Sequence, residues 1–355
     1  MTTDDTAFAD AAAWKATFDE RLKAYQEKLA TYREAKLEFE KQQRLQAASI
    51  DQTWVTDSKG PGELLFAVAP IGDTDIGELP TQRAAYSDRT CALMAKIARL
   101  AYVRFEDQEQ LKVLEGILGY GNLKRVQHLN VDETDVLVVE AEPFIVVAFR
   151  GTTSRDDFRT DLHARFNVAK SKVAGREIAV CVHSGFNDAY NKVNAQIHEI
   201  LAPFGAAPSK KPIYLTGHSL GGALALIASA ALAADPVLNA RLAAVYSFGC
   251  PRVGTKSFAE IVKAPHYRVV NSGDLVPLLP PTWLYGYRHT GMPVLLKEGV
   301  NRPIMRSPAG EAFFLALKSL FLWPWTRQML FVEKHNYSLY ISNLEWIAKY
   351  RGPRT

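Results

Sequence analysis

A serine between glycines is the first feature of this sequence that could do chemistry. It lies in GHSLGG, residues 217–222, after the apolar run PIYLT and before the run ALALIASAALAAD. This order predicts that Ser219 sits on a turn from a strand into a helix. Such a turn is tight and needs small neighbours, which Gly217 and Gly221 supply. Because the amino end of a helix favours a developing negative charge, the pattern indicates a nucleophilic serine.

A nucleophilic serine needs a general base, and the base needs a carboxylate to orient it. In α/β-hydrolases the acid follows the serine and the histidine follows the acid. Asp274 fits, because it follows the apolar strand in YRVVNSGD. Its rival Asp235, in AADP, is interpreted as a capping or loop residue. Two histidines follow Asp274, His289 and His335, and chain order alone leaves both open.

Strand-like and helix-like segments alternate through the part of the chain that would position these residues. A helix is expected from Ser87 to Phe105, and helical segments separate short Val- and Ile-rich runs. Those runs are DVLVVEAEPFIVVAFRG, IAVCVHSGF, PIYLTG, AAVYSFG and HYRVVNSGD. Alternation of this kind predicts the α/β class, a mainly parallel central sheet with helices on both faces, over residues 85–350.

Several segments between Tyr102 and Tyr340 together resemble the class 3, or fungal-type, lipase family of α/β-hydrolases. They are VVAFRGTTSRDDFRTDL, VHSGFNDAY, YLTGHSLGGALA, YSFGCPRVG, YRVVNSGDLVPLLPP and HNYSLY, in the family's order. The resemblance implies a serine hydrolase of lipid esters, most simply a triacylglycerol lipase, which needs neither cofactor nor metal. The alternatives are a phospholipase A1, a short-chain carboxylesterase, and a non-catalytic interaction protein on a lipase fold.

The same resemblance assigns roles to individual residues. Ser219 becomes the nucleophile, Asp274 the orienting acid and His335 the general base. His289, in YRHTG, matches a second family position near the site rather than the base.

The oxyanion hole and two further histidines are also matched to family positions. The amides of Leu220 and Thr152 are expected to hold the oxyanion, and Thr152 stands where the family often has serine. His218 and His183 are interpreted as hydrogen-bonded scaffold groups.

An amphipathic helix is expected directly after the oxyanion turn, in SRDDFRTDLHARF. Phe158, Leu162 and Phe166 recur every four residues, with charged residues between them. In the family this region is a lid that opens at a lipid surface. An ordinary surface helix packed on the body would require the same apolar spacing.

A second apolar segment, within an expected insertion at residues 292–332, includes AFFLALKSLFLW. This run is shorter than the roughly 20 apolar residues of a membrane-spanning helix, and Lys318 interrupts it. We expect Phe314 and Phe321 either to line an acyl-chain site or lipid interface, or to fill the core.

The first 50 residues predict one long amphipathic helix, followed by a turn-rich connector at residues 51–84. Phe18, Tyr25, Tyr32 and Phe39 recur every seven residues, as in a coiled coil. This stripe predicts packing against the body of the protein or a neighbouring helix, with self-association as the alternative.

Composition excludes several classes of function. The net charge of +4 is small and its basic residues are scattered, which argues against nucleic acid as a partner. Three cysteines without CxxC spacing, at positions 91, 181 and 250, predict buried free thiols. No secretory signal pattern opens the sequence, so cytoplasm is the default expectation, with signal-independent export or peripheral membrane association as alternatives.

Overall fold

The computed structural model describes residues 34, 85–120, 122–151, 166–173, 176–206, 211–280, 282, 286–297, 303 and 335–350. The chain divides into two compact units, Met1–Thr53 and Trp54–Thr355. Of the first unit only Glu34 is described, and it is helical. The rest of the expected N-terminal helix, and the connector up to residue 84, lie outside the described residues.

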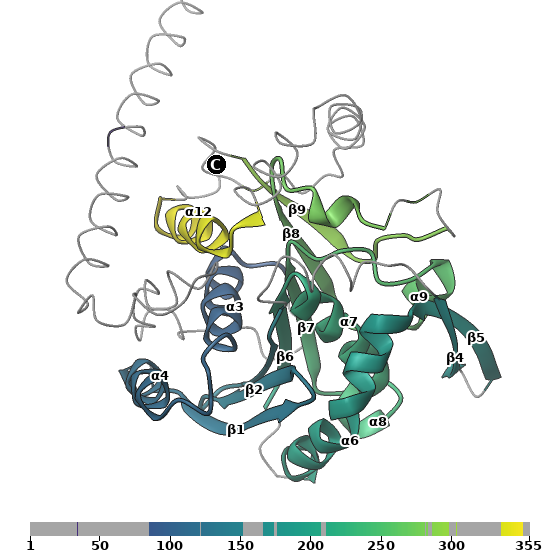
Figure 1. Cartoon of the computed structure of the whole chain (residues 1–355), viewed down its shortest axis with the longest axis horizontal. Helices are drawn as coiled ribbons and strands as arrows, with labels where there is room; N and C mark the ends of the chain where they lie inside the picture. Colours follow the sequence, from purple (N-terminus) through teal and green to yellow (C-terminus); the bar gives the residue numbers. More distant parts are fainter. Residues whose placement is uncertain are drawn as a thin grey trace, which may run out of the picture. The chain divides into compact units, whose positions relative to one another are not determined.

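A seven-stranded sheet forms the centre of the second unit, in the order β1-β2-β3-β6-β7-β8-β9 (Figure 1). Its strands are β1 (Lys124–Val131), β2 (Thr134–Glu140), β3 (Ile145–Phe149), β6 (Ile213–His218), β7 (Leu242–Phe248), β8 (His266–Asn271) and β9 (Met292–Leu296). The strands from β3 to β9 run parallel, whereas β1 and β2 are antiparallel. Strands β3, β6 and β7 are buried along their whole length, as expected for continuous apolar runs in a parallel sheet.

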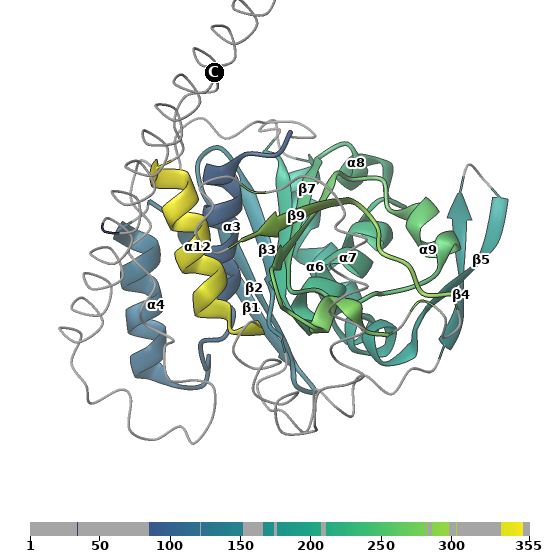
Figure 2. The same cartoon turned by 90° about the horizontal axis from the view of Figure 1, so that it is seen from above.

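Helices cover both faces of this sheet, as Figure 2 shows from above. One apolar core joins the sheet to α3 (Asp88–Leu100), α4 (Gln108–Tyr120) and α12 (Tyr337–Tyr350). A second core joins the other face to α6 (Ser184–Ala206), α7 (Leu220–Leu232), α8 (Pro236–Asn239) and α9 (Lys256–Ile261). The layered α/β architecture predicted from the sequence is therefore confirmed.

One predicted strand does not belong to the central sheet. The run IAVCVHSGF forms β5 (Arg176–His183), which pairs antiparallel with β4 (Phe166–Val173) in a separate two-stranded sheet. Its partner is the neighbouring strand in the sequence, as in a hairpin. Phe166 begins β4 and lies opposite His183, so the expected amphipathic helix does not extend to Phe166. Residues 152–165, with Phe158 and Leu162, lie outside the described residues.

The predicted start of the insertion, at residue 292, is also wrong. Residues 292–296 form β9, which pairs with β8 inside the central sheet, and Phe314 and Phe321 lie outside the described residues. Among the described helices, none combines the length and the apolar character needed to cross a bilayer. Cys91 and Cys250 are buried free thiols as predicted, whereas Cys181 is only partly buried.

Candidate active site

Ser219 occupies a strained turn between the end of β6 and the start of α7. Its φ is 56° and its ψ is −125°, a backbone conformation that residues other than glycine rarely adopt. Its amide donates to the Phe248 carbonyl at the end of β7, with an N to O distance of 2.9 Å. A Cβ at Gly217 would overlap the backbone of Gly221, and a Cβ at Gly221 would overlap the end of β3. The two glycines therefore permit the turn that presents Ser219.

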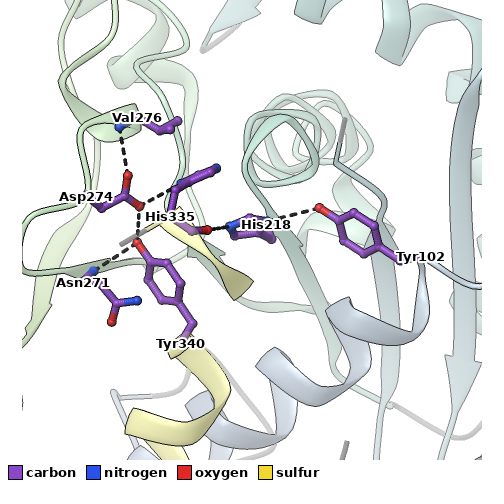
Figure 3. Close-up of polar contacts among 7 residues, drawn as sticks. All are labelled: Tyr102, His218, Asn271, Asp274, Val276, His335 and Tyr340. Atoms are coloured by element: carbon purple, nitrogen blue, oxygen red, sulfur yellow. Dashed lines mark hydrogen bonds and ion pairs between the residues drawn. The ribbon is translucent and has the colours of Figure 1, made fainter. Parts of the chain in front are cut away.

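Asp274 and His335 form a hydrogen-bonded pair at the same end of the sheet (Figure 3). Asp274 follows β8 and is 2% exposed. Its Oδ2 accepts from His335 Nδ1 at 2.9 Å, and its Oδ1 accepts from the amide of Val276, also at 2.9 Å. A third donor, the hydroxyl of Tyr340 on α12, lies 2.5 Å from Oδ2. Sequence reasoning missed Tyr340, although it lies in the segment HNYSLY.

The end of β7 brings this pair towards Ser219. Phe248, which binds the Ser219 amide, is followed by Gly249 with a φ of 56°. A Cβ at Gly249 would lie 2.8 Å from His335 Cε1 and 2.9 Å from Asp274 Oδ2. The His335 ring also stacks on that of His218, the neighbour of Ser219, with 4.5 Å between ring centroids. The serine, the acid and the histidine thus gather at one edge of the sheet.

The two rivals from the sequence have other partners. His289 is bonded through Nε2 to the carbonyl of Pro277 at 2.7 Å, and its pKa is lowered well below the usual value by burial and by nearby arginines. Asp235 is the N-cap of α8 and accepts from the amide of Val237 at 2.8 Å. Its interpretation as a capping residue is confirmed.

One of the two predicted oxyanion donors is described. Leu220 is the first residue of α7, where helix geometry provides no carbonyl acceptor for the amide within the helix. Thr152 lies outside the described residues, but Gly151 before it packs against the serine turn. A Cβ at Gly151 would lie 2.5 Å from the His218 carbonyl oxygen and 3.4 Å from Ser219 Cβ. The end of β3 therefore lies against the nucleophile turn.

The two histidines interpreted as scaffold differ in their partners. His218 is hydrogen-bonded at both nitrogens, to the Tyr102 hydroxyl and to the His335 carbonyl, each at 3.1 Å. His183 is buried and stacks on Phe186 with 4.0 Å between centroids. Neither of its ring nitrogens has a hydrogen-bond partner within the described part of the chain. Burial lowers the pKa of His183 to about 4, so hydrogen bonding was the wrong expectation there.

Comparison with known proteins finds lipases. The family model described as lipase (class 3) matches residues 146–283. A lipase of Rhizomucor miehei is 36% identical over 166 residues, which cover 45% of this chain and 44% of that protein. Residues 146–283 of this chain are thus similar to class 3 lipases. A secreted mono- and diacylglycerol lipase 1 of Fusarium solani is 37% identical over 161 residues, 44% of each protein.

The chain also resembles lipases of known structure in three dimensions. The crystal structure of a lipase from Rhizopus microsporus var. chinensis superposes with a TM-score of 0.51 and 28% identity. The match covers 65% of this chain and 82% of that one, and it confirms the α/β-hydrolase fold. The chain spans less than half the length of the two curated relatives above. The family match includes Ser219 and Asp274 but ends before His335.

Proposed function

We propose that this protein hydrolyses carboxylic esters of lipids through an acyl-enzyme, most simply as a triacylglycerol lipase. The observation that carries the proposal is the 2.9 Å bond between His335 Nδ1 and Asp274 Oδ2, beside the strained turn that holds Ser219. Acyl transfer requires a nucleophile, a base and an acid that orients the base, which Ser219, His335 and Asp274 would supply.

The chemistry follows from which ring nitrogen is engaged. Asp274 accepts a hydrogen bond from Nδ1–H of His335, which leaves Nε2 as the nitrogen that takes the Ser219 proton. The serine oxygen attacks the ester carbonyl, and the amides of Leu220 and Thr152 bind the oxyanion. His335 then protonates the leaving alkoxide, and water repeats the cycle on the acyl-enzyme.

A covalent probe tests this proposal directly. A fluorophosphonate should label the folded protein, and Ser219→Ala should abolish labelling. The matched control is Ser229→Ala, because Ser229 is also buried and lies on α7, the helix that follows the nucleophile. Labelling should survive in that variant. Absence of labelling in folded wild-type protein would refute the enzyme and leave the non-catalytic alternative.

The alcohol half of the substrate is a separate part of the proposal. The name of the Fusarium solani relative supports acylglycerols, whereas the proposed catalytic residues would act equally on phospholipids and short esters. Rates on tributyrin, triolein and phosphatidylcholine distinguish a lipase from a short-chain esterase and a phospholipase A1. A rate that rises sharply above the solubility limit of the substrate would support a lid that includes Phe158 and Leu162.

The acyl-chain role of the apolar segment needs its own test. We propose that Phe314 and Phe321 contact the acyl chain of a long-chain substrate. Replacement of both by Ser should then reduce activity on long-chain esters more than on short-chain esters. Equal loss on both would defeat this assignment.

A further inference from the structure

A chain of hydrogen bonds that the mechanism above does not use runs behind the candidate active site. Tyr102, just after α3, has its hydroxyl oxygen 3.1 Å from His218 Nδ1. The other nitrogen of that ring, Nε2, lies 3.1 Å from the carbonyl oxygen of His335 (Figure 3). The contacts join segments 116 and 117 residues apart in the sequence. Tyr102, which follows α3, is thus linked to the backbone of His335, the predicted general base.

The direction of each hydrogen bond follows from the groups involved. A carbonyl oxygen only accepts, so Nε2 of His218 carries the proton that it donates to His335. In the neutral ring Nδ1 is then the acceptor, and the Tyr102 hydroxyl donates to it. The oxygen of that hydroxyl also lies against the backbone of Gly151, because a Cβ at Gly151 would come within 2.3 Å of it, and the Gly151 backbone lowers the pKa of Tyr102 as a donor would. The series of polar contacts therefore runs from Gly151 through Tyr102 and His218 to His335.

The side chains of Tyr102 and His218 are both held neutral. Burial, the neighbouring His335 and the buried Arg99 lower the pKa of His218 well below its usual value. Burial raises the pKa of Tyr102 to about 12. The His218 ring is also held in place by stacking, with 4.4 Å to the Tyr337 ring centroid and 4.5 Å to that of His335. A neutral, stacked imidazole keeps one tautomer and one orientation.

This series of polar contacts joins two parts of the site that must act together, the oxyanion turn and the general base. Gly151 precedes the predicted oxyanion donor Thr152, and His335 is the predicted base. The carbonyl of His218 lies so close to Gly151 that a side chain at position 151 would collide with it. We propose that Tyr102 and His218 are positioning residues, which fix the separation between the oxyanion turn and the backbone of His335. The proposal rests on the ester hydrolase function proposed above.

Two substitutions of the full-length protein test it. Tyr102→Phe removes the hydroxyl that joins Gly151 to His218. His218→Phe keeps an aromatic ring to stack on Tyr337 but removes both nitrogens. Each should lower kcat on 4-nitrophenyl butyrate about 10- to 100-fold with KM changed less than about twofold, because a small misplacement of reacting groups has effects of this size. The rate of fluorophosphonate labelling should fall in parallel.

A matched control separates positioning from the loss of a buried hydroxyl. Tyr190 lies on α6, is 1% exposed and donates to Asn194 at 2.9 Å. Tyr190→Phe should leave kcat and labelling close to the wild-type values. The double variant of Tyr102 and His218 should lose about as much activity as one single variant, since both act through one chain.

The outcomes discriminate between the two proposals. Wild-type protein that is not labelled at Ser219 would overturn the enzyme function and this inference with it. If the wild type is labelled at Ser219 and Tyr102→Phe is labelled as fast as Tyr190→Phe, the positioning role alone is overturned. Losses that multiply in the double variant would also overturn it. If His218→Phe does not fold, the comparison of Tyr102→Phe with Tyr190→Phe decides the question.

Discussion

The hydroxyl oxygen of Tyr340 lies 2.5 Å from Oδ2 of Asp274, the same carboxylate oxygen that accepts from His335 Nδ1. The amide of Asn271 donates to this hydroxyl at 3.0 Å, so the phenolic proton points to the carboxylate. Burial and the Asp274 charge raise the pKa of Tyr340 well above its usual value, which keeps it a donor. These donors satisfy the oxygen atoms of a carboxylate that is buried away from water.

Replacing Tyr340 by Phe removes one of these donors and leaves the Asn271 amide without the hydroxyl. We expect the free energy of unfolding to fall by about 1–3 kcal/mol, the cost of unpaired buried polar groups. Urea unfolding measures this change. We also expect kcat to fall while KM stays nearly constant, because in the proposed mechanism Asp274 orients the base and does not bind the substrate. Unchanged stability and unchanged kcat would show that Asp274 does not depend on Tyr340.

Asp274→Asn should leave the fold intact and reduce kcat by about 10³- to 10⁴-fold. An amide in place of the carboxylate cannot stabilise the imidazolium and favours the wrong tautomer of His335. Single-turnover hydrolysis of an activated ester measures the loss. The matched control is Asp235→Asn, because Asn caps a helix about as well as Asp and Asp235 caps α8. If the two variants lost activity equally, Asp274 would not be the orienting acid.

Gly249→Ala should disrupt the His335 and Asp274 pair. The new Cβ would lie 2.8 Å from the imidazole and 2.9 Å from the carboxylate, and the backbone φ of 56° already disfavours alanine. We expect kcat to fall at least about 100-fold. Gly116→Ala is the control, since its Cβ meets nothing within 4 Å in helix α4. That variant should be fully active and up to about 1 kcal/mol more stable.

The sequence was most informative where a local pattern forces a local conformation. Gly217 and Gly221 around Ser219 predict the turn because only small residues fit it, and the apolar runs predict the buried strands β3, β6 and β7. Asp274 followed from its place after a strand. Choosing His335 over His289 required the family resemblance, since chain order allows both.

Features that depend on contacts between distant segments were missed. Tyr102 meets His218 only because α3 packs on the face of the sheet against β6, and Tyr340 meets Asp274 only because α12 packs beside β8. No short-range periodicity encodes such contacts. The hairpin of β4 and β5 was misassigned for a related reason: an apolar run predicts a strand but not the sheet to which it belongs.

The buried imidazole of His183 should make the protein sensitive to acid. Its folded-state pKa of about 4 lies below the ordinary 6.5, so between these values the unfolded chain binds a proton that the folded chain does not. The free energy of unfolding therefore falls as the pH decreases from about 6.5 to 4, because the unfolded chain takes up a proton at His183 that the folded chain does not. The shift corresponds to roughly 3 kcal/mol at most.

His183→Phe isolates this contribution, because it keeps a ring to stack on Phe186 and removes the titrating group. Urea unfolding at pH 7.5 and pH 4 should show that wild type loses more stability than the variant, by up to about 3 kcal/mol. Other buried histidines, such as His266, destabilise both proteins equally at acid pH, since burial lowers its pKa to about 3 in each. Parallel stability curves for the two proteins would show that His183 takes up its proton without cost in the folded state.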